Sequence, residues 1–258
     1  MATKVDWSTL SPHLSIVDQD SHRSTNVPLD QNSPEFPWIT KDTDFIEWES
    51  DEKPQALWLS GHRDGMKEVT SQVIHYAKEK AIQSNGCALY FFCASAREVR
   101  RSIATIFAHT LLRQIVCFSG GDGQAITTAF LMSLLEGHIQ RNLPGFKKDD
   151  SLDTTVKRIL DVPDEDLRIA LVKAIAVAKL RDLSLIIDGI SIATSKDDAF
   201  VRNVSFLVDH MVDARTTRFK ALLTSPQHSE LRGLLGHLPS IELDKERNGC
   251  ASIMPVSE

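Results

Sequence analysis

The chain has 258 residues and a formal net charge of −6. This length can bury one substantial core, and the acidic balance lacks the excess of Lys and Arg that marks nucleic-acid-binding proteins. Residues 1–10 lack the apolar segment of a secretory signal, and no stretch reaches the roughly 18 to 20 apolar residues of a membrane span. The cysteines form no CxxC pair: Cys87, Cys93, Cys117 and Cys250. We therefore expect a soluble cytoplasmic protein with buried free thiols, which binds neither nucleic acid nor a membrane.

The composition changes near residue 40. Residues 1–40 are rich in Ser, Asp, Asn and Pro, so we expect an extended or partly disordered leader. Residues 44–50 then predict a short helix that packs on the main domain, for which we expect the bounds 41–246. Residues 247–258 form a polar C-terminal tail.

Short apolar runs alternate with helical patterns along the domain. Five runs predict strands: 56–59, 87–93, 183–188, 219–224 and 241–243. The run CALYFFC at 87–93 is apolar almost throughout, which is typical of a strand covered on both faces. Its Tyr90, Phe91 and Phe92 are therefore expected in the core rather than on a stacking platform.

Apolar residues at helical spacing predict helices between these runs. The predicted segments are 69–81, 99–111, 131–139, 156–160, 164–181, 200–211 and 231–235. The helix near Pro163 begins with a capping residue, Asp164, and ends in basic residues, as the helix dipole favours. Strands interleaved with helices indicate an α/β fold: a right-handed, three-layer domain with a five-stranded, mostly parallel sheet.

The junction after the first strand is the first candidate for a ligand site, because ligands bind beyond the carboxyl ends of the strands in such sheets. Residues 61–68 read GHRDGMKE. A working P-loop has the form G-x-x-x-x-G-K-[ST], whose backbone N–H groups wrap the phosphates. Gly61 and Lys67 match this form. Met66 stands at the second glycine and Glu68 at the hydroxyl residue, so the strict motif is not met.

Four segments together resemble the NACHT-type P-loop NTPase domain of fungal STAND and NOD-like receptor proteins, the nephrocystin-like N-terminal NTPase domain included. They are FIEWESDEKPQALWLSG at 45–61, LYFFCAS at 89–95, LSLIIDGIS at 183–191 and KALLTSPQ at 220–227. They resemble, in order, the entry to the P-loop, the second strand, the Walker B strand and the sensor strand. The resemblance covers residues 36–244 and implies a P-loop NTPase fold.

The resemblance also implies which residues would hold ATP or GTP with Mg²⁺. Lys67 keeps the phosphate lysine, and Asp188 keeps the Walker B aspartate that would orient the metal ion. Gly61, Gly65 and Thr224 complete the candidate nucleotide site, together with Glu68 at the metal-hydroxyl position.

Several of the family's catalytic positions are altered. Ser191 and Ile192 stand where an acidic pair would polarise the attacking water, and Pro226 replaces the sensor arginine. Asp64 and Met66 replace loop glycines. A carboxylate such as Glu68 about 4 Å from a phosphate oxygen costs on the order of 4 kcal/mol, roughly a thousandfold in affinity. Hydrolysis suffers more than binding, because positioning and charge stabilisation supply most of phosphoryl-transfer catalysis.

Other polar residues have simpler explanations. His62 and Arg63 are expected to be solvated loop residues. The remaining histidines, among them His75 and His109, show no metal-ligand spacing, and no G-x-S-x-G elbow supports a serine hydrolase.

Two functions of different classes follow. The first is a degenerate P-loop domain that acts as a non-catalytic interaction or regulatory module, with a protein partner or a second copy of itself. The second is a signalling switch that retains ATP or GTP through Lys67 and Asp188 with slow or no hydrolysis. Reuse of the same sheet edge for unrelated chemistry is a third possibility.

Overall fold

The structure is a computed structural model that describes residues 39–51, 55–61, 63–84, 86–98, 102–118, 164–178, 180–191, 197–213, 218–226, 235 and 238–243. Almost all of the predicted leader, the tail, and the helices predicted at 131–139 and 156–160 lie outside these residues. So do most of the helix predicted at 231–235 and the side chain of Cys117.

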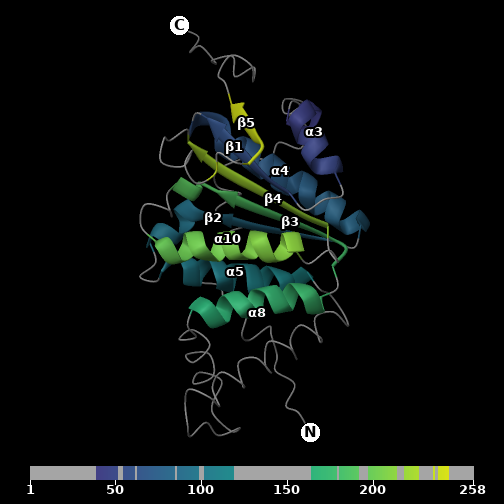
Figure 1. Cartoon of the computed structure of the whole chain (residues 1–258). Helices are drawn as coiled ribbons and strands as arrows, with labels where there is room; N and C mark the ends of the chain where they lie inside the picture. Colours follow the sequence, from purple (N-terminus) through teal and green to yellow (C-terminus); the bar gives the residue numbers. More distant parts are fainter. Residues whose placement is uncertain are drawn as a thin grey trace, which may run out of the picture.

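A five-stranded, all-parallel sheet forms the centre of the domain (Figure 1). Its strands are β1 (Gln55–Gly61), β2 (Cys87–Phe92), β3 (Asp182–Asp188), β4 (Arg218–Pro226) and β5 (Ser240–Leu243), in the spatial order β2-β3-β4-β1-β5. The sheet therefore confirms the predicted fold class and all five predicted strands. Four strands extend one or two residues beyond the predicted run at one or both ends, and β2 ends one residue earlier.

Helices cover both faces of the sheet (Figure 1). One face carries α3 (Thr43–Ser50) and α4 (Arg63–Ser84), and the other carries α5 (Ile103–Phe118) and α10 (Asp198–Asp213). Helix α8 (Asp164–Val177) packs mainly against α5 and α10, so it adds a partial outer layer to the predicted three. Among the described helices, none combines the length and apolarity that crossing a bilayer requires.

Alternate residues of β1 to β4 contribute to two separate hydrophobic cores, one on each face of the sheet. On β2, Phe91 packs with Phe107 of α5 and Phe200 of α10, with ring centroids 5.2 and 6.0 Å away. Its neighbours Tyr90 and Phe92 point to the opposite face, in the core beneath α4. All three β2 aromatics are buried, which confirms that they are core residues. Burial on both faces explains why this strand is apolar throughout.

Strand β2 lies at an edge of the sheet, and a side chain covers its free backbone. The amide of Gln114, on α5, accepts a hydrogen bond from the N–H of Tyr90 and donates one to the carbonyl of Tyr90, each at 2.9 Å. This pair replaces the bonds that a further strand would make, so it blocks unwanted strand pairing there.

The start of α5 differs from the predicted one. The pattern predicts a helix from residue 99, whereas a short 3-10 helix, η2 (Cys93–Glu98), follows β2 and α5 begins at Ile103. Ser102 explains the later start, because its hydroxyl accepts a hydrogen bond from the N–H of Thr105 and caps the helix.

A second 3-10 helix, η1 (Ile39–Lys41), precedes α3. Ile39 is buried in the core beneath α4, so the folded part reaches at least two residues ahead of the predicted bound at residue 41.

Candidate functional site

The junction between β1 and α4 contains less loop than a P-loop needs. Strand β1 ends at Gly61 and helix α4 begins at Arg63. Of the eight positions that the P-loop pattern covers, the six from Arg63 to Glu68 are therefore helical. A helix directs its N–H groups along its axis, whereas a P-loop wraps them around the phosphates.

Gly61 has a structural explanation that needs no nucleotide. Its φ is +154°, and a Cβ atom added there would lie 2.4 Å from the Cβ and 2.7 Å from the carbonyl oxygen of Leu243 on β5. Strand β5 pairs with β1 at this point, so the close approach of the two backbones itself requires glycine.

The last three positions of the P-loop pattern, Met66, Lys67 and Glu68, differ in their exposure to solvent. Met66 is buried in the core beneath α4, Lys67 is exposed and Glu68 is half-buried. Met66 therefore acts as a core anchor at the position where a working P-loop has glycine. Gly65 lies within the first turn of α4, and the described glycines with positive φ are Gly61 and Gly189.

Asp188 lies at the carboxyl end of β3, buried and held by two hydroxyl groups. Thr224, on the neighbouring β4, donates a hydrogen bond of 2.8 Å to Asp188 Oδ1 and accepts one of 3.1 Å from the N–H of Gly189. Thr70, two turns into α4, lies 3.0 Å from the same oxygen and 2.8 Å from the carbonyl of Met66, so its one hydrogen serves two acceptors. These bonds tie α4, β3 and β4 together through one carboxylate.

The sequence predicted two of the three residues in this network. Asp188 and Thr224 are brought together as expected, whereas Thr70 was missed. Thr70 belongs to no position of the P-loop pattern, and only the packing of α4 on the sheet places its hydroxyl beside Asp188. Lys67, three residues earlier on α4, is exposed.

This network does not suit a magnesium ion. Mg²⁺ requires near-octahedral oxygen ligands, and a P-loop supplies one from the hydroxyl at the position that Glu68 occupies here. Asp188 Oδ1 instead accepts hydrogen bonds from the chain's own threonines. Among the described residues, no three His, Cys, Asp or Glu side chains converge as a metal site would require.

The two described thiols confirm the expectation of buried free thiols. Cys87 and Cys93 are buried free thiols. Burial raises the pKa of Cys87 to about 12. Burial, and to a smaller extent the negative charge of Asp188, raises the pKa of Cys93 well above its usual value. His75 is exposed and lies 3.3 Å from Glu79, one turn further along α4. His62 lies outside the described residues.

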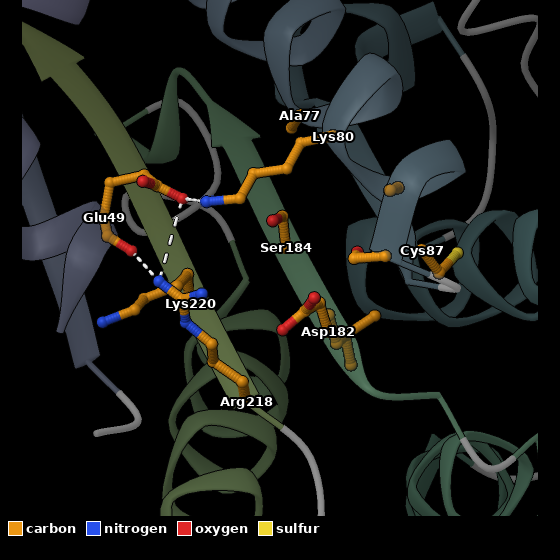
Figure 2. Close-up of a pocket in the computed structure, with 11 residues that line it drawn as sticks. Glu49, Ala77, Lys80, Cys87, Asp182, Ser184, Arg218 and Lys220 are labelled. Atoms are coloured by element: carbon orange, nitrogen blue, oxygen red, sulfur yellow. Dashed lines mark hydrogen bonds and ion pairs between the residues drawn. The ribbon is translucent and has the colours of Figure 1, made fainter. Parts of the chain in front are cut away.

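A second polar cluster lies at the opposite, amino-terminal edge of the sheet (Figure 2). Lys80 from α4 and Arg218 from β4 both contact the carboxylate of Glu49 from α3. Lys220 lies two residues along β4 and is 95% buried, with 5% of its surface exposed. Sequence patterns did not single out any of these residues, because they come from three separate elements and match no motif.

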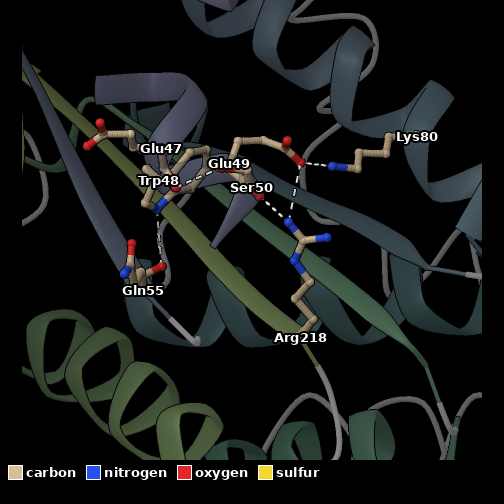
Figure 3. A network of polar contacts seen from close by, with 7 residues as sticks. All are labelled: Glu47, Trp48, Glu49, Ser50, Gln55, Lys80 and Arg218. Atoms are coloured by element: carbon tan, nitrogen blue, oxygen red, sulfur yellow. Dashed lines mark hydrogen bonds and ion pairs between the residues drawn. The ribbon is translucent and has the colours of Figure 1, made fainter. Parts of the chain in front are cut away.

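The same cluster fastens α3 to the sheet (Figure 3). Arg218 also donates to the carbonyl of Glu49, and the indole N–H of Trp48 donates to the carbonyl of Gln55 at 3.3 Å. Beneath these bonds, Trp48 and Phe45 are buried in the core under α4. The short helix predicted at 44–50 is thus confirmed, and it packs on the domain as expected.

A family model described as Nephrocystin 3, N-terminal matches residues 36–225. The match spans 190 of the 258 residues and includes the sheet except β5 and the last residue of β4. The chain belongs to this family. The comparison supports the nephrocystin-like part of the resemblance and does not by itself extend it to fungal STAND or NACHT proteins. No curated protein matches the chain at a significant level.

Proposed function

We propose that the chain is a degenerate P-loop domain that acts in the cytoplasm as a non-catalytic interaction or regulatory module. We also infer that it is related to the NACHT-type domains of STAND proteins, on the four sequence segments described above. One observation carries the proposal: two of the chain's own threonines, Thr70 and Thr224, hydrogen-bond to Oδ1 of Asp188, the residue that would orient a metal ion.

The helix at the P-loop position supports the same conclusion. With residues 63–68 helical, the backbone N–H groups from Lys67 onward can bond to carbonyl groups within α4 and are not presented to a phosphate. Withdrawing Met66 from the core to form a loop would expose an apolar side chain and cost about 1.5–3 kcal/mol. A nucleotide would have to supply this free energy in addition to that lost through Glu68.

A titration tests the loss of nucleotide binding. We expect ATP, ADP and GTP, with and without Mg²⁺, to leave the Tm of the full chain unchanged relative to salt of equal ionic strength. Isothermal calorimetry should give no saturable heat. Stabilisation by several degrees that is absent from Lys67→Ala would refute the proposal.

The second function, a nucleotide-retaining switch, is favoured by one observation. Lys67 is exposed near the N-terminus of α4, where the helix dipole favours an anion. This function predicts that nucleotide accompanies the protein through purification. Chromatography of the heat-denatured protein should then release ATP, ADP or GTP in near-stoichiometric amounts, whereas a degenerate module releases none.

The interaction role predicts a partner, for which a second copy of the chain is the first to test. Sedimentation over a wide range of protein concentration should show reversible association if the partner is another copy. A monomer at every concentration would direct the search to a different protein.

A further inference from the structure

Helix α3 rests on a surface that α4, β3 and β4 form together, the seat of α3. The seat combines apolar with positively charged side chains: Val73, Tyr76, Ile186, Lys80, Arg218 and Lys220. Two pockets remain between the seat and α3, and each has a cavity of ≈ 20 Å³, which is room for about one water molecule. Helix α3 therefore fills the seat almost completely.

Two aromatic side chains anchor α3 in the apolar part of the seat. Phe45 and Trp48 lie three positions apart, so they share one face of the helix, and both are buried. The ring of Phe45 lies 6.3 Å from that of Tyr76 on α4, and Nζ of Lys220 lies 5.9 Å from the ring of Trp48. Ile46 lies on another face of α3 and is 47% exposed. The seat thus receives one face of the helix and leaves the other in solvent.

Carboxylates of α3 face the cations of the seat. Glu49 contacts both Lys80 and Arg218 (Figure 3). Burial lowers the pKa of Lys220 to about 8, and the charge of Asp51, the C-cap of α3, acts in the opposite direction. The C-terminal end of a helix itself favours nearby cations. The fit between α3 and the seat is therefore electrostatic as well as apolar.

Removal of α3 would leave the charges of the seat unbalanced. Among the described residues that line the two pockets, Asp182 would be the remaining carboxylate beside three mutually repelling cations. A segment that replaces α3 must therefore be a helix with two apolar anchors followed by a carboxylate, the pattern of Phe45, Trp48 and Glu49. A second copy of the chain carries this helix.

Helix α3 is held to the seat by side chains and not by strand pairing. Within the described part of the chain its backbone hydrogen bonds are local, from the N–H of Ile46 to Asp42 and from the N–H of Asp51 to Glu47. The helix can therefore leave its seat without breaking a bond of the sheet. An isolated helix of eight residues is not stable in water, so a released α3 gains by entering a seat again.

We propose that two copies of the chain associate by exchanging α3, so that each helix occupies the seat of the other copy. Residues 51–54 connect α3 to β1 and would span the two molecules. Exchange keeps every contact between α3 and the seat, so it needs no new interface, and only a high protein concentration favours it. This inference rests on the proposed interaction role and specifies how a second copy serves as the partner.

Zero-length cross-linking of isotope-labelled chains tests the exchange. Equal amounts of ¹⁴N- and ¹⁵N-labelled full chain are mixed at high concentration, incubated just below the Tm and treated with a carbodiimide, which joins contacting lysine and carboxylate side chains. Mass spectrometry then reads the isotopes of the peptides that Glu49 and Lys80 join. Complete exchange should give about half of these pairs as one light and one heavy peptide, whereas a helix in the seat of its own chain gives like-labelled pairs.

Sedimentation of the same sample distinguishes two ways of failing. Like-labelled pairs alone in a sample that associates would overturn the exchange and leave the proposed interaction role intact. Like-labelled pairs in a sample that stays monomeric at every concentration would overturn both the exchange and the choice of a second copy as the partner.

Variants separate release of the helix from the dimer itself. Phe45→Ala weakens docking within and between chains alike, so it should speed the appearance of light–heavy pairs several-fold. Ile46→Ala, on the exposed face of the same helix, is the matched control and should mix at the rate of the wild type. A wild-type rate in Phe45→Ala would mean that α3 does not leave its seat and that the proposal is wrong.

The connection between α3 and β1 provides an independent variant. Four glycines inserted after Lys53 let α3 reach its own seat more easily, because a longer connection disfavours exchange between chains. The insertion should lower the fraction of light–heavy pairs about 3- to 10-fold. An unchanged fraction would contradict the exchange.

Discussion

At the scale of single residues, neither glycine of the segment 61–68 needs a bound phosphate to explain it. Gly61 is required by the approach of β5, and Gly65 is an ordinary helical position. The partial match to the pattern at Gly61 therefore has a cause unrelated to phosphate. This explains why Gly61 and Lys67 made the motif partly recognisable although the loop itself is not formed.

Substituting the two glycines should have opposite effects on stability. Gly61→Ala introduces a Cβ atom 2.4 Å from Leu243 at a positive φ, so it should cost at least about 1–3 kcal/mol of unfolding free energy. Gly65→Ala should gain about 0.5–1 kcal/mol, because alanine is the better helix former. Urea denaturation measures both. A loss of stability in Gly65→Ala would mean that residue 65 is not an ordinary helical position.

Lys220 should make stability depend on pH. Its pKa is about 8 in the folded chain and about 10.4 when unfolded, so between these values the unfolded chain binds more protons and stability rises with pH. Below pH 8 both states are protonated and the contribution is constant. Relative to Lys220→Met, the wild type should gain no more than about 1 kcal/mol between pH 7 and pH 9, since the pocket is partly open to solvent.

The range for this measurement ends at pH 9 because two buried thiols oppose the contribution of Lys220 at higher pH. The raised pKa values of Cys87 and Cys93 keep both thiols protonated in the folded chain, so their contribution to stability falls above about pH 9, where the unfolded thiols ionise. Lys173→Met, at an exposed lysine of α8, should show the same pH dependence as the wild type. A constant difference between wild type and Lys220→Met would show that Lys220 keeps an ordinary pKa.

At the scale of the elements, one carboxylate joins the starts of two helices. Asp197 precedes α10, and its Oδ1 accepts from the N–H of Phe200 while its Oδ2 accepts from the N–H of Ala104 in α5, each at 3.1 Å. The residue thus caps its own helix and bonds to the first turn of another. Sequence patterns predicted both helices but could not reveal this bond, because Ala104 and Asp197 are 93 residues apart.

Removing this carboxylate should loosen both helices. Asp197→Ala should cost about 2 kcal/mol, about 1 kcal/mol for each lost bond, and should speed hydrogen exchange at Ala104 and Phe200 together. Asp197→Asn keeps one acceptor and should lose about half as much. The adjacent exposed Asp198→Ala serves as the control, and an equal loss in that variant would exclude a role specific to Asp197.

At the scale of the whole molecule, the Asp188 network joins α4 to strands β3 and β4 at the carboxyl edge of the sheet. Thr70→Val and Thr224→Val each remove one hydroxyl from a buried carboxylate and should each cost about 1–3 kcal/mol. The double variant should lose more than the sum, because Asp188 is then left without either donor. Urea denaturation of the four proteins in the cycle gives the coupling.

A threonine outside the network provides the control for this cycle. Thr110 is buried on α5, on the far side of the sheet, so Thr110→Val should combine additively with Thr70→Val. Strict additivity of Thr70→Val with Thr224→Val would instead show that the two hydroxyls act independently and that the network is not a unit.

The sequence by itself determined the α/β architecture and most of its elements. Continuous apolar runs identified all five strands, because a strand covered on both faces is apolar along its length. Apolar residues at helical spacing identified α4, α5, α8 and α10, because a helix buried on one face repeats its apolar residues every three or four positions. The resemblance of LSLIIDGIS and KALLTSPQ to the family's Walker B and sensor strands also assigned Asp188 and Thr224 to one site.

Only the tertiary structure decided how those residues are used. The strand order places β4 between β1 and β3, which sets Thr224 beside Asp188, and the packing of α4 adds Thr70 to them. At the other edge, Glu49 and Arg218 meet although 169 residues separate them. Such pairs leave no periodicity in the sequence, because they depend on how distant elements pack and not on the conformation of either one.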